Sequence, residues 1–168
     1  MFKTIVADPP WDFNDHLPGA SRGSANNYNT LSVKQIQNFL LPLIAPDARL
    51  FLWRVAAMQE EALSVMRAWD FTPKTEIVWL KTTKYEKPWF GMGHTVRMSH
   101  EVCLIGQRGH PEVLSHSIRS IFSAPYTKHS GKPKAFFDLV ESLSPGPYLE
   151  LFAREQRLGW TCLGNECH

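Results

Sequence analysis

The sequence predicts an α/β protein built on one doubly wound sheet, because strand patterns alternate with helical patterns along the chain. Mostly apolar runs such as 2–7, which is also rich in β-branched residues, and 48–53 have the length and composition of strands that are buried in a sheet. Between such runs, apolar residues recur at the three- and four-residue spacing of amphipathic helices. The 168 residues show no internal repeat or linker, so a single domain over 1–168 is expected.

Composition narrows the class of protein. Hydrophobic residues make up 43% and charged residues 20%, which is ordinary for a soluble globular domain. The net charge of +2 permits a nucleic-acid partner without requiring one. No apolar run approaches the roughly 20 residues of a membrane span, and the N-terminus lacks a signal-peptide pattern. A cytoplasmic protein without a membrane partner is therefore expected, and its three scattered cysteines predict neither a disulfide framework nor a metal site.

The first predicted strand, 2–7, ends at Asp8-Pro9-Pro10-Trp11. Proline cannot donate to a sheet ladder, so Asp8 is expected at the carboxyl edge of the sheet with free backbone carbonyls beside it. Ligands bind at this edge in open α/β sheets. The carboxylate and a proline carbonyl can each accept one N–H of a flat amino group, and Trp11 can stack on its ring. The alternative is a turn that ends the strand and places the tryptophan in the core.

A polar segment, 12–29, follows directly and is typical of a lid or binding loop. Arg22 and Tyr28 in this segment are candidate substrate contacts, Arg22 through a phosphate. Thr30 or Ser32 can then cap a helix whose apolar positions lie between 36 and 44 and which Pro46 ends.

The remaining elements follow from apolar runs bounded by turn residues and from helical spacing. In chain order they are a strand over 48–53, a helix with its apolar stripe from Met58 to Trp69, strands over 75–80 and 101–106, a short strand over 120–124, a helix that starts at Ser130-Gly131-Lys132-Pro133, and strands over 148–153 and 160–163.

The segment 82–99 interleaves basic, aromatic and glycine residues, a mixture that suits contact with a nucleic-acid backbone and an unstacked base. A glycine-rich hairpin with its aromatic residues packed inward is the alternative. The candidate substrate contacts in and beside this segment are Lys81, Gly91, Gly93, His94, Arg97 and His100.

Several stretches together resemble the MT-A70 adenine N6-methyltransferases, which use S-adenosylmethionine. They cover nearly the whole chain in the family's order, and the short length resembles the phage and bacterial branch, which acts on DNA. The matching stretches are Asp8-Pro9-Pro10-Trp11, Leu50-Phe51-Leu52-Trp53, Glu76-Ile77-Val78-Trp79-Leu80-Lys81, Gly91 and Gly93, Arg97 with His100-Glu101, His129-Ser130 with Lys132-Pro133, Leu149-Glu150-Leu151-Phe152-Ala153-Arg154, and Gly159-Trp160 with Gly164-Asn165-Glu166.

The resemblance implies a Rossmann-like methyltransferase fold in circularly permuted order, with the catalytic strand first and the donor-binding strands last. It implies that Asp8 to Trp11 bind the adenine amino group and that Lys132 pairs with the carboxylate of the methyl donor. The residues implied on the donor side are Ala7, Asp8, Lys132, Glu150, Phe152, Arg154, Asn165 and Glu166. The chain departs from longer eukaryotic members by a shorter link after Arg154 and by glutamate instead of glutamine at 166.

The expected function is therefore transfer of a methyl group from S-adenosylmethionine to the N6 of adenine in DNA, without a metal. A base in duplex DNA must leave the stack to reach such a pocket. RNA adenine is an alternative acceptor, and the N4 amine of cytosine a weaker one. A non-catalytic subunit that presents nucleic acid to a partner is the alternative from another class. Because a small catalytic domain offers limited surface for reading sequence, a homodimer is also an expectation.

Overall fold

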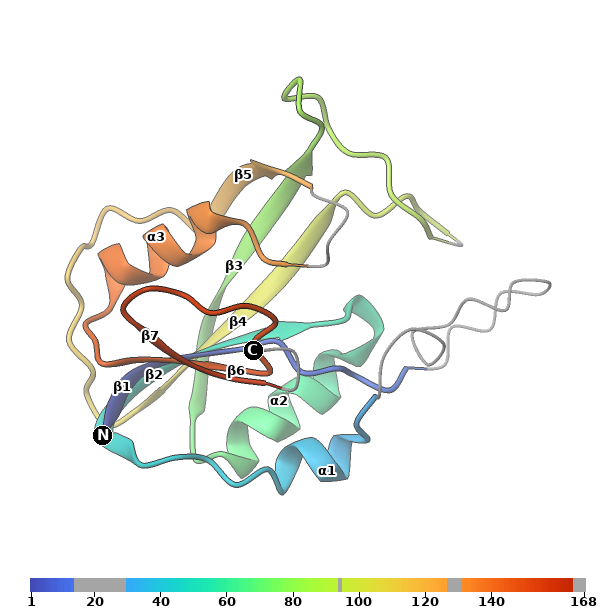
Figure 1. Ribbon diagram of the computed structural model, residues 1–168. Helices are drawn as coiled ribbons and strands as arrows, with labels where there is room; N and C mark the ends of the chain where they lie inside the picture. The colour runs from blue at the N-terminus through green and yellow to red at the C-terminus, as the bar shows by residue number, and fades with distance from the viewer. Residues whose placement is uncertain (14–29, 94, 127–130, 165–168) are drawn as a thin grey trace.

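The computed structural model describes residues 1–13, 30–93, 95–126 and 131–164 of the chain. In these residues one sheet has the strand order β5-β3-β4-β2-β1-β6-β7 (Figure 1). The strands are β1 (Phe2–Ala7), β2 (Ile44–Arg54), β3 (Thr72–Thr82), β4 (His100–Arg108), β5 (Ile121–Pro125), β6 (Tyr148–Leu151) and β7 (Trp160–Leu163), and the helices are α1 (Val33–Gln37), α2 (Gln59–Ala68) and α3 (Lys134–Leu143). The predicted Rossmann-like α/β fold is confirmed.

The sheet contains both parallel and antiparallel strand pairs. β1 runs parallel to both β2 and β6, β7 is parallel to β6, and β5 is parallel to β3. Only β4, among the described strands, is antiparallel to its neighbours, β2 and β3. The first strand therefore lies centrally, with β6 and β7 on one side of it and β2, β4, β3 and β5 on the other.

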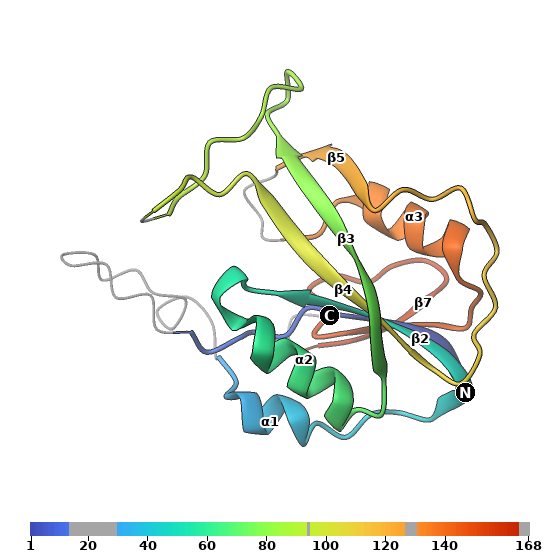
Figure 2. The same ribbon diagram turned by 180° about the vertical axis from the view of Figure 1, so that it is seen from behind.

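Helices cover both faces of the sheet, as a doubly wound arrangement requires. Figures 1 and 2 show α1 and α2 on one face and α3 on the other. Alternation along β2 sends Leu50 and Leu52 into the core beneath α2, and Phe51 and Trp53 into the core beneath α3. This stretch of β2 is thus apolar on both faces.

The first helix is shorter than the sequence predicts. Ser32 caps α1 in a capping box with Gln35, as one of the two expected caps. The helix stops at Gln37, however, and Ile44 already belongs to β2. Pro42 explains the difference, because it lacks an N–H and disfavours helical backbone at the residue before it. The side chain of Leu40, expected in the buried stripe, is 91% exposed.

Strands β2, β3 and β4 extend beyond their predicted bounds at both ends, and two further boundaries differ near the residues of the predicted site. Helix α3 begins at Lys134 and Pro133 is its N-cap, so Lys132 precedes the helix instead of lying in its first turn. Strand β6 ends at Leu151, two residues earlier than expected. Phe152 has a φ of 59°, a left-handed conformation that cannot continue a strand.

Candidate functional site

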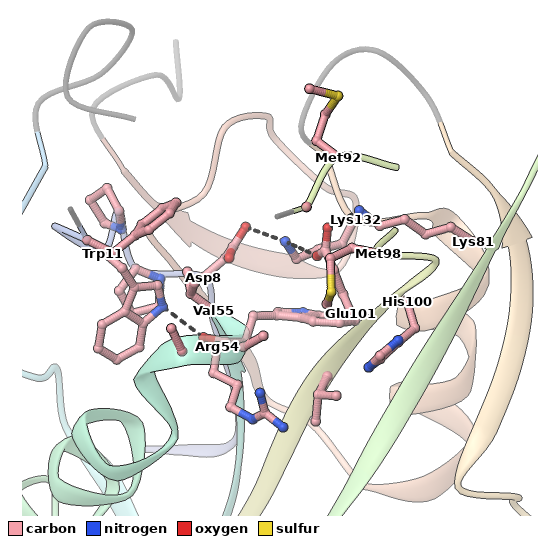
Figure 3. Close-up of a pocket in the computed structure, with 18 of the residues that line it drawn as sticks. Asp8, Trp11, Arg54, Val55, Lys81, Met92, Met98, His100, Glu101 and Lys132 are labelled. Atoms are coloured by element: carbon pink, nitrogen blue, oxygen red, sulfur yellow. Dashed lines mark hydrogen bonds and ion pairs between the residues drawn. The ribbon is translucent and has the colours of Figure 1, made fainter. Parts of the chain in front are cut away.

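A cavity of about 690 Å³ opens where β1, β2 and β3 end and β4 begins (Figure 3). Its volume lies within the range of small-molecule sites, and its position matches the carboxyl edge at which open α/β sheets bind ligands. Residues from the turn after β1, the ends of β2 and β3, the segment between β3 and β4, and the approach to α3 line it. They include Asp8, Pro9, Pro10, Trp11, Trp53, Arg54, Lys81, Met92, Gly93, Arg97, His100, Glu101, Tyr126, Lys132 and Arg154.

Four charged side chains form a network in the wall of this cavity. Lys132 Nζ lies 2.9 Å from Asp8 Oδ2 and 3.0 Å from Glu101 Oε2, as Figure 3 shows. Lys81 Nζ lies 2.5 Å from Glu101 Oε1. Lys132 Nζ also lies 4.8 Å from the ring centroid of Trp53, a cation–π contact. Two cations and two carboxylates balance here, so the network can be buried without net charge.

The network shifts the pKa values of Lys132 and Glu101. Burial alone would lower the pKa of Lys132, but the carboxylates of Asp8 and Glu101 outweigh burial and raise it. Burial likewise acts to raise the pKa of Glu101, but Lys132 and Lys81 reverse this and lower it. Lys132 is therefore a permanently charged ammonium group on the cavity wall.

The turn after β1 has its own hydrogen bonds. The Trp11 N–H donates to the Pro9 carbonyl at 2.8 Å, and the Leu31 N–H donates to the Pro10 carbonyl at 2.8 Å. The expectation that these carbonyls are free is therefore wrong, because the folded chain brings backbone donors back to them. A carbonyl oxygen has two lone pairs, so each retains capacity for one further N–H.

Trp11 combines a core position with a place at the cavity. Its side chain belongs to the core under α1 and α2 and is 5% exposed, as the core alternative predicted. Its Nε1 donates to the Trp53 carbonyl at 3.0 Å and so ties the end of β1 to the end of β2. Trp11 also lines the cavity. Its stacking on a base stays a prediction.

Only some of the residues expected on the donor side line the cavity. Arg154 lines the cavity with Asp8 and Lys132. Ala7 is fully buried in β1, and Phe152 packs its ring 4.9 Å from that of Phe39. Glu150, on β6, is not among the cavity-lining residues.

Glu150 has an unusual ionisation. Its side chain is 13% exposed and its Oε2 lies 3.7 Å from Arg157 Nε. Burial raises the pKa of Glu150 from 4.5 to about 7, Arg157 opposes the rise, and the negative charges of Asp8 and Glu155 add to it. A carboxyl group of this kind is half-protonated near neutral pH and can both donate and accept hydrogen bonds.

Substitution Glu150→Gln should remove a pH dependence of stability. A carboxyl whose pKa is raised on folding stabilises the folded state fully below about pH 4.5, and this contribution is lost as pH rises through about 7. We expect wild-type stability to fall by on the order of 2–3 kcal/mol across that window and Glu150→Gln to be flatter. Urea unfolding at pH 5.5 and pH 8 measures this. Parallel pH profiles of the two proteins would contradict it.

The segment between β3 and β4 projects beyond the sheet as an irregular hairpin. A Cβ on Gly91 would lie 2.1 Å from the Met98 carbonyl oxygen, so the two arms approach closely there. The glycine-rich hairpin alternative is thus correct in its backbone. Its aromatic residues are not uniformly inward, because Trp89 packs 4.7 Å from the Tyr126 ring while Phe90 is 77% exposed.

The polar candidates of this segment differ in their surroundings. Arg97 donates to the Gly93 carbonyl at 2.7 Å and lies over the Phe90 ring. Lys81 is held in the charged network by Glu101. The cavity is lined by Lys81, Arg97, Gly93 and His100, whereas Gly91 does not line it.

Five candidates lie outside the described residues, namely Arg22, Tyr28, His94, Asn165 and Glu166.

Sequence reasoning missed Glu101 as a site residue, although it lies within the matched motif after His100. A charged residue at the start of an apolar strand could have identified it, because such a residue must find a partner once the strand is buried. Arg54, Trp53 and Tyr126 also line the cavity without having been predicted there.

Within the described part of the chain, no group of three or more His, Cys, Asp or Glu side chains could hold a metal ion. No helix there is long and apolar enough to cross a bilayer.

The chain is similar to a protein family and to several known proteins along almost its whole length. The family model described as MT-A70 matches residues 2–166. An Arabidopsis thaliana N(6)-adenosine-methyltransferase MT-A70-like protein is 30% identical over 98% of this chain and 24% of its own length. Human N(6)-adenosine-methyltransferase catalytic subunit METTL3 is 29% identical over 98% of this chain and 28% of its own length. Human N(6)-adenine-specific methyltransferase METTL4 is 33% identical over 98% of this chain and 37% of its own length. The chain thus spans between a quarter and two fifths of the length of these relatives.

Proposed function

Because the chain belongs to the MT-A70 family, we propose that it transfers a methyl group from S-adenosylmethionine to the N6 amino group of an adenine in nucleic acid, with DNA as the preferred acceptor. The observation that carries the proposal is the Asp8 carboxylate, held by Lys132 at the mouth of a cavity at the carboxyl end of β1. Asp8 offers a charged acceptor where the fold binds ligands.

The chemistry of the cavity fits the methyl donor that this family uses. Lys132 is a buried cation that suits the donor's carboxylate, and Arg154 lies on the same cavity wall. Glu150 lies on β6 outside the cavity lining, and its carboxyl group, partly protonated near neutral pH, suits the hydroxyl groups of a ribose that extends beyond the cavity. S-adenosylmethionine would supply an electrophilic methyl group at this site.

The acceptor amine needs orientation, because its lone pair is shared with the aromatic ring. We assign Asp8 and the second lone pair of the Pro9 carbonyl to its two N–H bonds. The ion pair with Lys132 uses Asp8 Oδ2 and holds the carboxylate in place before the base arrives. A group oriented in advance lowers the barrier without reorganisation during the reaction.

The choice between DNA and RNA rests on two opposing indications. The resemblance to the phage and bacterial branch favours DNA, and METTL4 is named for adenine specificity. The Arabidopsis and METTL3 relatives are eukaryotic proteins whose names specify adenosine, which favours RNA as a second candidate acceptor. The residues that meet the base are the same in both cases.

Mass spectrometry of nucleosides tests the reaction and the acceptor together. The protein is incubated with isotopically labelled donor and with duplex DNA, single-stranded DNA and RNA of matched sequence. We expect labelled N6-methyladenine, with more label in a DNA sample than in the RNA. More label in RNA would transfer the proposal to the second acceptor, and labelled cytosine alone would overturn the assignment to adenine.

The non-catalytic alternative differs in one measurable property. A subunit that only presents nucleic acid needs no methyl donor, whereas the proposed enzyme binds one donor per cavity. We expect titration calorimetry with S-adenosylmethionine to give saturable binding by the isolated chain. Absence of heat together with absence of label would favour the subunit. The expected homodimer and cytoplasmic location stay predictions, and light scattering during size-exclusion chromatography tests the first.

A further inference from the structure

One cation of the cavity, Arg54, lacks a partner among the described residues. Its Nε is buried and makes no hydrogen bond. The neighbouring cations are all engaged, since Lys81 and Lys132 pair with carboxylates and Arg97 donates to a backbone carbonyl. Leaving a buried donor unsatisfied costs free energy, so an unpaired arginine that lines a cavity is suited to an incoming anion.

Sheet order assigns Arg54 to one half of the cavity. The turn at Asp8 follows the central strand β1, and the strands of the donor side, β6 and β7, lie on one side of it. Arg54 ends β2, on the opposite side, next to β4. In Figure 3 its side chain extends away from the network of Asp8, Lys132 and Glu101. The free cation therefore lies in the half that remains for the acceptor.

The backbone beside Arg54 is fixed relative to the amine-binding turn. Trp11 Nε1 donates to the carbonyl of Trp53, the residue before Arg54. Arg54 is itself paired with Val102 of β4 in the sheet. The backbone that carries the Arg54 side chain thus has a set position relative to Asp8. Rigid placement of this kind allows an arginine to act as a positional anchor.

We propose that Arg54 binds a phosphodiester group next to the target adenine, an inference that rests on the proposed function. A nucleic-acid acceptor carries one such anion per nucleotide, and a guanidinium matches phosphate oxygens with paired N–H donors. Phosphate contacts set the register of the strand without reading its sequence. Arg54 is accordingly a binding and positioning residue for the acceptor strand, and the donor does not contact it.

The first test uses wild-type protein and changes the charge of one linkage in the nucleic acid. A fluorescent single-stranded oligonucleotide with one adenine is made with a neutral methylphosphonate at the linkage on its 5′ side, on its 3′ side, or at a distant position. We expect one adjacent replacement to weaken binding to wild-type protein by roughly 10-fold in fluorescence anisotropy. The distant replacement serves as control and should change binding much less.

Variants then connect that linkage to Arg54. Arg54→Gln should weaken binding of the all-phosphate strand by a similar factor and lower the slope of log affinity against log salt by about 0.7. The affinity of Arg54→Gln should change little when the adjacent linkage is a methylphosphonate. Arg54→Lys should keep the wild-type salt slope and part of the wild-type affinity for the strand. Arg67→Gln, which removes an exposed arginine of α2 outside the cavity, is the matched control.

The outcomes separate this inference from the proposed function. If wild-type protein methylates adenine but no adjacent methylphosphonate weakens binding, the assignment of Arg54 is wrong and the function stands. Loss of affinity for S-adenosylmethionine in Arg54→Gln, with strand binding intact, would also overturn it by assigning Arg54 to the donor. A wild-type protein that binds the strand through this linkage but transfers no methyl group would contradict the proposed function alone. If Arg54→Gln fails to fold, the methylphosphonate measurements on wild-type protein still test the phosphate contact, and Arg54→Lys tests its connection to Arg54.

Discussion

Replacing Asp8 with alanine should slow methyl transfer by about 10- to 200-fold, the equivalent of one charge-assisted hydrogen bond of about 1.5–3 kcal/mol. The carboxylate is the charged acceptor nearest to the proposed amine site, and the substitution leaves Lys132 paired with Glu101. The fold should survive, because Asp8 lies beyond the last residue of β1. The measurement is the single-turnover rate at saturating donor and acceptor.

Two comparisons make this result specific. Asp8→Asn keeps one acceptor oxygen but loses the charge, so its rate should lie between those of the wild type and the alanine variant. Asp138→Ala removes a carboxylate on α3 that pairs with Lys134, and it should transfer methyl at the wild-type rate. A rate for Asp8→Ala within twofold of the wild type would exclude the proposed role of Asp8.

Replacing Lys132 with methionine should weaken donor binding by roughly 10- to 100-fold, because the ammonium group is the proposed partner of the donor's carboxylate. The same change leaves Asp8 without its cation and removes one of the two lysines that lower the pKa of Glu101. We expect the pKa of Glu101 to rise and the free energy of unfolding to fall by about 1–3 kcal/mol. Titration calorimetry and urea unfolding measure the two effects.

A second substitution separates the two roles of Lys132. In Lys132→Met with Glu101→Gln, one of the carboxylates left behind becomes neutral, so part of the lost stability should return while donor binding stays weak. Lys134→Met removes a lysine two positions away whose side chain is 81% exposed, and it should match the wild type in both measurements. Wild-type donor affinity in Lys132→Met would remove this lysine from the donor site.

Lys132 can bind a ligand carboxylate in addition to its two partners within the protein. In the structure Lys132 is satisfied by Asp8 and Glu101, although the family resemblance implied a donor carboxylate as its partner. A lysine has three N–H donors, so it can hold both protein carboxylates and one oxygen of a ligand. The network thus places the proposed partner of the donor's carboxylate, Lys132, next to the proposed partner of the adenine amine, Asp8.

Local patterns made much of the fold predictable. The strand before Asp8 and the strand at 48–53 are mostly apolar, which is typical of burial on both faces, and both strands form, the second with the wider bounds of β2. The direction of β4 was not predictable in this way, since an apolar run has the same composition in either direction. Likewise, the apolar residues at 40–44 fit a helical stripe, but Pro42 breaks that helix and Leu40 faces solvent.

The sequence by itself determined the chemistry at the end of the first strand, because a buried apolar run followed by a carboxylate and two prolines places that carboxylate at a sheet edge in almost any α/β arrangement. The tertiary structure alone decided which charges meet there. Asp8, Lys81, Glu101 and Lys132 belong to four separate segments, and their pairing depends on distance and burial. Patterns between neighbours in the chain follow from local backbone preference, whereas electrostatic pairing acts through space and appears only once the sheet has brought the strand ends together.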